Sequence, residues 1–406
     1  MQSCFPDKSD RQTGTCQRRP NEKTAHVTQT SDFSQACRLR GLRPISNAPT
    51  LGRVTHHCRR PPVPKSFANP FRGTGLLSNW SLPKDDPTPV AALLSGCPKH
   101  GVTPLRTAPD LAQVCGLADL RIKDESGRMG LGSFKALGAA YVIARDASRV
   151  GPPSANGRTY VAASAGNHGL SVAAGAATFG ARAVIYLADT VPEAFANRLR
   201  SKGAEVVRAG ATYEDSMKAA QRAADNNGWT LLSDSSWEDY TDAPLAVMEG
   251  YLQLAAEAVE QMPTPPTHIL LQAGVGGMAA ALAAHFRKVW GDDPQILVVE
   301  PDAAPALIGS IRAGRPITTS GPISCMGRLD CKTPSMIALA GLSRDADTFV
   351  TITEDEARDG VALLDRYGFA TTPSGGAGLA ALIAGLPGVG ADARVLAILS
   401  EGPEDG

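Results

Sequence analysis

The sequence predicts an α/β protein whose open, mostly parallel sheets carry helices on both faces. From about residue 88, short runs rich in β-branched residues alternate with alanine-rich stretches of helical periodicity, and glycine-rich loops follow several of the short runs. Such alternation is typical of parallel strands joined by helices. We expect a large domain formed by residues 88–136 and 244–406, and a small domain, residues 137–243, inserted into it.

Eight short apolar runs are predicted as strands. In chain order they are Leu120–Lys123, Tyr160–Ala163, Ala183–Leu187, Glu205–Arg208, His268–Gln272, Ile296–Glu300, Phe349–Ile352 and Val395–Leu399. Helices are predicted between these runs, where apolar residues recur every three to four positions. They include Phe134–Arg145, Gly169–Phe179, Glu193–Lys202, Tyr213–Asn226, Ala243–Gln261 and Glu354–Tyr367.

The composition excludes several classes of protein. The chain is 43% hydrophobic and holds 40 basic and 40 acidic side chains, which excludes a wholly disordered chain and a nucleic-acid binder working through bulk positive charge. No apolar run approaches the roughly 20 residues that span a bilayer. We therefore expect neither a nucleic-acid partner nor a membrane partner.

The charge is unevenly distributed along the chain. Residues 1–65 hold 12 basic and 4 acidic side chains, which leaves 28 basic and 36 acidic ones for residues 66–406. We assign residues 1–87 to a basic N-terminal extension, and its lack of hydrophobic periodicity predicts disorder. It has no apolar stretch of a secretory signal. The open alternatives are an artefact of an upstream start codon and, from its arginine content, an organelle transit peptide.

The cysteines agree with a reducing compartment. Four of the eight lie within residues 1–58, and Cys97, Cys115, Cys325 and Cys331 lack the spacing of zinc ligands. We expect a cytoplasmic protein with no structural metal and no disulfide framework.

The chemistry is expected in loops that follow strands, because ligands of open α/β sheets bind beyond the carboxyl ends of the strands. The first such loop, Gly132-Ser133-Phe134-Lys135, opens a helix. The positive end of the helix dipole would lower the pKa of the Lys135 amine, which suits an imine-forming group. The alternative is a solvated surface lysine.

The second loop runs from Ser164 through Ala165, Gly166, Asn167 and His168 to Gly169. Its glycines would let the backbone approach a planar ligand, and Asn167 offers a side-chain donor. The alternatives are a helix N-cap for Asn167 and a hydrogen-bonded, half-buried core residue for His168.

Two further loops follow later strands. Gly274, Val275, Gly276 and Gly277 open a helix, where successive backbone amides form a cradle suited to a phosphate. This loop is neither a Walker A motif nor a complete G-x-G-x-x-G, so a tight structural turn is an equal alternative. Ser400 directly follows the last predicted strand, where its hydroxyl could face the crevice or cap a turn.

Together, the four loops resemble those of the tryptophan synthase β-like family of pyridoxal-phosphate enzymes, also called fold type II. The resemblance covers roughly residues 88–406. It implies pyridoxal 5'-phosphate as cofactor, bound between the two domains, with Lys135 as its Schiff-base lysine. It further implies that Asn167 contacts the cofactor ring, that Gly274 to Gly277 hold its phosphate, and that Ser400 contacts its pyridine nitrogen. A homodimer and substrate binding by Ser164, Ala165, Gly166 and His168 are implied in the same way.

Within this family, the segments 124–131 and 234–241 are similar to those of the diaminopropionate ammonia-lyases. This resemblance implies α,β-elimination from a small β-substituted amino acid, giving a 2-oxo acid and ammonia. Lys135 would remove the α-proton, and Asp234 would act as a second acid–base group. The alternative for Asp234 is an N-cap of a segment beginning near Ser235, while Trp237 and Tyr240 are expected to pack.

One residue departs from that pattern. These lyases carry an aspartate, the base for the D-isomer, where this chain has Ala165, and the resulting motif resembles serine and threonine dehydratases. A serine, threonine or 3-hydroxyaspartate dehydratase is therefore the first alternative function. A β-replacement synthase and a non-catalytic pyridoxal-phosphate-binding protein are further alternatives, and intact Lys135, Asn167 and Ser400 argue against the last.

Overall fold

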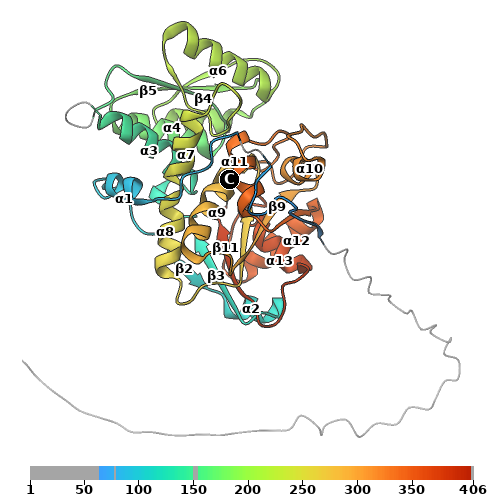
Figure 1. Cartoon of the computed structure of the whole chain (residues 1–406). Helices are drawn as coiled ribbons and strands as arrows, with labels where there is room; N and C mark the ends of the chain where they lie inside the picture. The colour runs from blue at the N-terminus through green and yellow to red at the C-terminus, as the bar shows by residue number, and fades with distance from the viewer. Residues whose placement is uncertain (1–63, 77–78, 150–153, 404–406) are drawn as a thin grey trace, which may run out of the picture. The chain divides into compact units, whose positions relative to one another are not determined.

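The computed structural model describes residues 64–76, 79–149 and 154–403, which belong to one compact unit. The predictions made for residues 1–63 lie outside the described residues. Two sheets organise the described part, and Figure 1 labels some of their strands and most of the helices.

The larger sheet has seven strands in the order β1-β10-β9-β8-β11-β3-β2. Its five inner strands are mutually parallel, and the edge strands β1 and β2 pair antiparallel to β10 and β3. The bounds are β1 Lys65–Ala68, β2 Leu105–Thr107, β3 Asp119–Asp124, β8 His268–Gln272, β9 Gln295–Pro301, β10 Thr348–Ile352 and β11 Arg394–Leu399.

The smaller sheet has four parallel strands in the order β6-β5-β4-β7. They are β4 Thr159–Ala163, β5 Arg182–Leu187, β6 Glu205–Arg208 and β7 Thr230–Leu231. Strand register decides which side chain faces which layer. In β4 and β5, Val161 and Val184 pack with Ala220 in one cluster, while Tyr160 and Ile185 belong to another, so both faces of this sheet are covered.

Helices and one 3-10 turn connect the strands. Before the smaller sheet they are α1 Thr88–Leu94, α2 Pro109–Cys115, η1 Arg128–Gly130 and α3 Lys135–Ala147. Along and after that sheet they are α4 Asn167–Thr178, α5 Glu193–Ser201, α6 Tyr213–Asn227, α7 Asp242–Gly250 and α8 Leu252–Gln261. The remaining ones are α9 Gly277–Trp290, α10 Ala306–Ala313, α11 Met336–Asp345, α12 Glu354–Arg366 and α13 Ala377–Gly385.

The predicted fold class is confirmed, and each of the eight predicted strands is present to within one residue at either end. Three short strands, β1, β2 and β7, were not predicted. Each lies at the edge of its sheet and pairs on one side only, so none needs a long apolar run.

Two boundaries need correction. Residues 65–68, assigned to the N-terminal extension, form β1 and pair with Thr348–Thr351 of β10. The single helix predicted over 243–261 is interrupted at Tyr251, which separates α7 from α8.

One apolar cluster spans both sheets. It contains Tyr160 and Ile185 of the smaller sheet together with Val298 and Leu396 of the larger one. Because the core is continuous, the division at residues 137 and 243 stays a prediction. Within the described residues, no helix is long and apolar enough to cross a membrane, the four cysteines are free, and no group of three or more His, Cys, Asp or Glu side chains is arranged to hold a metal.

Helices α3 and α7 approach each other through glycines. A methyl group at Gly250 would lie 2.6 Å from the Leu137 carbonyl oxygen and 3.0 Å from Gly138 Cα. Both contacts are with backbone, which cannot rotate away. This close crossing sets the position of the first turn of α3 relative to the end of α7.

We predict that Gly250→Ala lowers the free energy of unfolding by about 1–3 kcal/mol, because the added methyl overpacks this crossing. Urea unfolding measures the change. In the control, Gly390→Ala places a methyl group in open space, and its effect should stay within about 0.5 kcal/mol. Equal effects of the two substitutions would contradict the crossing argument.

Candidate active site

Lys135 is the first residue of α3, at the end of the loop that follows β3 and η1. Its ammonium donates a hydrogen bond to the Asp234 carboxylate, and both side chains are about four-fifths buried. Asp234 lies between β7 and α7. The fold thus joins two of the predicted residues, 99 positions apart in sequence, in one ion pair.

The electrostatics of Lys135 differ from the prediction. Burial alone would lower the pKa of its amine, but the adjacent Asp234 carboxylate outweighs burial and raises the pKa above its usual value. Burial opposes ionisation of Asp234 as well, yet the charges of Lys135 and His168 hold the pKa of that carboxyl well below its usual range. The prediction of a lowered lysine pKa is therefore wrong for this pair, because a full charge in contact exceeds the partial charge of a helix end.

Two aromatic rings flank the Lys135 amine. Its Nζ lies 5.4 Å from the ring centroid of Phe134 and 5.9 Å from that of Tyr251, and the two rings pack edge to face. Burial raises the pKa of Tyr251 to about 12, so its phenol is neutral. Sequence reasoning missed Tyr251, because a tyrosine inside an apolar helical pattern gives no signal of a site.

The predicted phosphate cradle is the N-terminus of α9. Gly276 caps this helix in a left-handed conformation, with φ of 98°, and has no side chain to occupy the first-turn amides. Those amides lack partners within their own helix. A methyl group at Gly277 would lie 3.7 Å from the Asp234 carbonyl oxygen and 3.9 Å from Tyr251, so the cradle adjoins the ion pair.

The neighbouring residues of the cradle are tightly packed. A methyl group at Gly274 would lie 3.0 Å from both Cys331 Sγ and Leu329 Cα. The Val275 carbonyl accepts a hydrogen bond of 3.0 Å from the Ser335 amide. A simple tight turn, the alternative for this loop, would not account for the uncapped N-terminus of α9 next to the buried pair of Lys135 and Asp234.

The loop Ser164–Gly169 joins β4 to α4. Its turn is close, since a methyl group at Gly169 would lie 2.2 Å from the Ser164 carbonyl oxygen. The Asn167 amide donates to Glu401 Oε2 at 2.5 Å. The N-cap position is Gly166, and no side-chain cap is present, so the capping alternative for Asn167 is wrong.

His168 is buried in the same loop. Its Nε2 lies 2.8 Å from the Leu232 carbonyl oxygen, while its Nδ1 has no hydrogen-bond partner among the described residues. Burial lowers the pKa of His168, although Asp234 opposes this. The hydrogen-bonded core histidine, the alternative considered for this residue, agrees with this geometry.

Ser400 follows β11 and is buried beside the loop that carries Lys135. Its carbonyl accepts a hydrogen bond of 3.0 Å from the Phe134 amide, and its own amide donates to Gly375. The next residue, Glu401, accepts hydrogen bonds from Asn167, Thr372 and Arg328. Sequence reasoning missed Glu401, whose only signal is its place next to Ser400.

A cavity of about 490 Å³ opens beside these loops. Its lining includes Ala165, Gly166, Cys325, Gly327, Arg328 and Thr372. Two predicted substrate residues therefore border a space large enough for a small amino acid.

The segment around Asp234 has no helix at Ser235. The next helix, α7, begins at Asp242, so the N-cap alternative for Asp234 is wrong. Trp237 and Tyr240 stack with ring centroids 4.4 Å apart, as expected for residues that pack. The Tyr240 hydroxyl donates to the Leu231 carbonyl at 2.8 Å, which ties the segment to β7.

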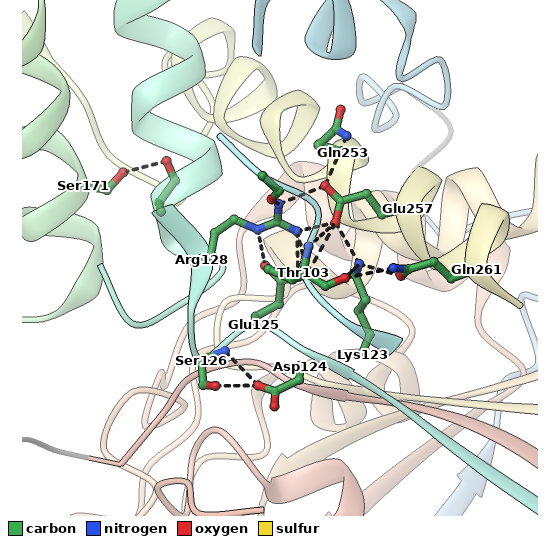
Figure 2. Close-up of polar contacts among 12 residues, drawn as sticks. Thr103, Lys123, Asp124, Glu125, Ser126, Arg128, Ser171, Gln253, Glu257 and Gln261 are labelled. Atoms are coloured by element: carbon green, nitrogen blue, oxygen red, sulfur yellow. Dashed lines mark hydrogen bonds and ion pairs between the residues drawn. The ribbon is translucent and has the colours of Figure 1, made fainter. Parts of the chain in front are cut away.

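A buried charge network anchors the segment that leads to Lys135 (Figure 2). The Arg128 guanidinium bonds to both Glu125 and Glu257, at 2.7 to 2.9 Å, and Lys123 donates to Glu257 at 2.7 Å. All four side chains are fully or almost fully buried, and their charges sum to zero. The network fastens η1 to α8, so the chain enters α3 from a fixed point.

The residues present fit pyridoxal phosphate. The Lys135 amine lies two residues from the buried Ser133 hydroxyl, which has no hydrogen-bond partner among the described residues, and the uncapped N-terminus of α9 lies next to Asp234, the partner of that amine. Lys135 would hold the cofactor covalently, the amides of Gly276 and Gly277 would bind its phosphate, and Asn167 and Ser400 would offer polar groups to its ring.

Comparison with known proteins agrees with this fit. The model of the pyridoxal-phosphate dependent enzyme family matches residues 97–401, and the chain belongs to that family. It is an enzyme of fold type II.

Particular relatives are more informative. Diaminopropionate ammonia-lyase of Salmonella typhimurium is 32% identical over 299 residues, covering 68% of this chain and 74% of that protein. A serine dehydratase-like protein of Mus musculus is 29% identical over 293 residues, covering 71% of this chain and 84% of that protein. The structure of diaminopropionate ammonia-lyase from Escherichia coli with an aminoacrylate-PLP azomethine intermediate superposes with a TM-score of 0.76 at 30% identity, covering 84% of this chain and 94% of that one.

The buried network generates a prediction about acid stability. Burial alone would raise the pKa of Glu257, but hydrogen bonds and charge from Arg128, together with Lys123, lower it from 4.5 to about 2. Because the pKa of Glu257 is lower in the folded chain than in the unfolded chain, its ionisation stabilises the fold at pH values above about 4.5. This contribution is lost as the pH falls from about 4.5 through about 2. Glu257→Gln should therefore cost about 3–5 kcal/mol at pH 7, because it leaves buried cations uncompensated.

Urea unfolding at pH 7 and at pH 3 measures the effect, and the gap between wild type and Glu257→Gln should narrow at the lower pH. The matched control is Glu205→Gln, which removes an exposed pair with Arg182 and should cost no more than about 1 kcal/mol. A gap that is unchanged between the two pH values would contradict the role given to Glu257.

Proposed function

We propose that this enzyme is an ammonia-lyase that eliminates the β-amino group of a 2,3-diaminopropionate-like amino acid, giving a 2-oxo acid and ammonia. The observation that carries the proposal is the Lys135–Asp234 ion pair beside the cradle of α9. The relatives of Salmonella typhimurium and Escherichia coli named for this activity support the substrate class.

When bound, pyridoxal phosphate supplies the electron sink that makes cleavage of the Cα–H bond possible. The chain supplies the proton transfers. Lys135 Nζ, in its neutral form, is the amine placed to remove the α-proton, and the ionised Asp234 carboxylate in contact with it stabilises the ammonium that this transfer forms. Phe134 and Tyr251 cover the amine and limit the access of water.

The charge of Asp234 favours loss of ammonia over loss of water. Its lowered pKa keeps the carboxylate ionised. An ionised carboxylate attracts a β-ammonium group, which leaves without further protonation, whereas a β-hydroxyl needs a proton donor. A serine, threonine or 3-hydroxyaspartate dehydratase stays the second candidate, because Ala165 lines the cavity where the ammonia-lyase pattern has an aspartate.

The remaining site assignments are part of the proposal. Asn167, Ser400 and the amides from Gly274 to Gly277 would hold the cofactor, and Ser164, Ala165 and Gly166 would contact the substrate. His168 would position this loop through its contact with Leu232.

The proposal also covers the assembly. We place the enzyme in the cytoplasm as a homodimer. The domain division at residues 137 and 243 is supported by the strand segments, since the smaller sheet draws all its strands from residues 159–231.

A substrate panel tests the function. Purified holoenzyme is incubated with L- and D-diaminopropionate, L-serine, L-threonine and 3-hydroxyaspartate, and the 2-oxo acid and ammonia are measured. We expect L-diaminopropionate to be preferred. Its D-isomer should react at least about 100-fold more slowly, because Ala165 offers no proton acceptor. Faster turnover of a hydroxyamino acid would replace the lyase assignment with the dehydratase, and no product from any amino acid would favour a non-catalytic binding protein.

Substitutions at the ion pair test the residue roles. Lys135→Ala should abolish both turnover and the visible absorbance of the bound cofactor. Asp234→Asn should keep the absorbance but lower kcat by about 10²–10⁴, the range of an impaired acid–base step, because Lys135 loses the charge that stabilises its ammonium. The control is Asp239→Asn in the same segment, whose side chain is exposed and whose kcat should be unchanged. An Asp234→Asn enzyme with normal kcat would remove Asp234 from the mechanism.

A further inference from the structure

Lys332 holds three oxygen atoms from three separate places in the chain. Its ammonium donates to the Ala303 carbonyl at 2.8 Å, to the Pro322 carbonyl at 3.0 Å and to the Asp330 carboxylate. An ammonium group has three N–H donors and no acceptor. All three donors are therefore used, and two of their partners are backbone carbonyls.

The backbone itself brings these oxygens together. A methyl group at Gly321 would lie 2.1 Å from the Ala303 carbonyl oxygen, so only glycine allows the two segments to approach this closely. The second oxygen of the Asp330 carboxylate accepts a hydrogen bond of 3.2 Å from the Ser324 amide, which orients the first toward the ammonium. The oxygen cluster is thus held by contacts that do not involve the lysine side chain.

This arrangement differs from an ordinary surface ion pair. Lys288 bonds to the Asp85 carboxylate at 3.0 Å, and both side chains are about half exposed. The Lys332 and Asp330 side chains are 27% and 14% exposed. Carbonyl and carboxylate oxygens converging on one positive charge are the ligand set that proteins present to hard cations.

We propose that the Lys332 ammonium is a tethered monovalent cation, which holds segment 319–335 in place and makes a free potassium or sodium ion unnecessary there. Lys332 is a positioning residue, because its ammonium contacts neither Lys135 nor the lining of the cavity.

The segment carries one wall of the site. Cys331 and Leu329 pack against Gly274 of the cradle, and the Ser335 amide bonds to the Val275 carbonyl. Cys325, Gly327 and Arg328 of the same segment line the cavity. A shift of this segment would therefore move the cradle and the cavity wall together.

Removal of the lysine head group should convert a built-in cation into a required one. In Lys332→Ala the three oxygens would lose their positive charge but keep their backbone positions. We expect kcat/KM to fall about tenfold in choline chloride, the scale of a small displacement in a catalytic site. Potassium or rubidium chloride at about 0.1 M, matched in ionic strength to the choline buffer, should restore most of the loss. Ammonium salts are avoided because ammonia is a product of the proposed reaction.

Thermal unfolding of the holoenzyme gives a second readout, which does not depend on the reaction catalysed. The Tm of Lys332→Ala should be higher in potassium than in choline chloride, whereas wild type and the control Lys288→Ala should have equal Tm and activity in both salts. Equal Tm of Lys332→Ala in the two salts would overturn the proposal. A several-fold rise of wild-type activity in potassium chloride would also overturn the proposal. This measurement needs only the wild-type enzyme, so it can be made even if the variant does not fold. The cation proposal goes beyond the proposed function, and failure of the substrate panel would leave the Tm test intact.

Discussion

The site depends on the contact between the Lys135 ammonium and the Asp234 carboxylate. Neither group could stay charged at this depth alone, because desolvation penalises an isolated buried ion. Each therefore needs the other, and the segment after β7 has to lie against the start of α3. The same segment borders Gly277 at the start of α9, so one ion pair brings the reactive amine, its carboxylate and the phosphate cradle to one place.

The surrounding structure keeps that amine in position through buried polar networks. A buried network such as that of Lys123, Arg128 and Glu257 is often no more stable than apolar packing, because its desolvation offsets its attraction. Its geometry is directional, however, and it fastens η1 to α8 just before Lys135. Glu401 acts similarly next to Ser400, where it ties Asn167 to Thr372 and Arg328.

Much of the fold was predictable because inner strands of parallel sheets are buried on both faces and therefore read as short apolar runs. The edge strand β1 escaped prediction, since Lys65–Ala68 is largely exposed and is defined by its pairing with β10. The four loops were predictable for a similar local reason, because glycine before a helix start is visible in sequence. Tyr251 was not, since it lies beside Lys135, a residue 116 positions away in the chain. Lys332 was not either, because its contacts with the Ala303 and Pro322 carbonyls are made by the fold and leave no pattern of residue types.

The sequence by itself determined the α/β class, the order of the loops that follow the strands and the presence of a lysine at a helix start. These properties depend on local periodicity and on residue types at short spacing. Only the tertiary structure decided the charge state of Lys135, which the helix end alone would have disfavoured and which Asp234 stabilises. Electrostatic interactions act through space and depend on burial, so the same lysine has a different pKa once a carboxylate 99 residues away is folded against it.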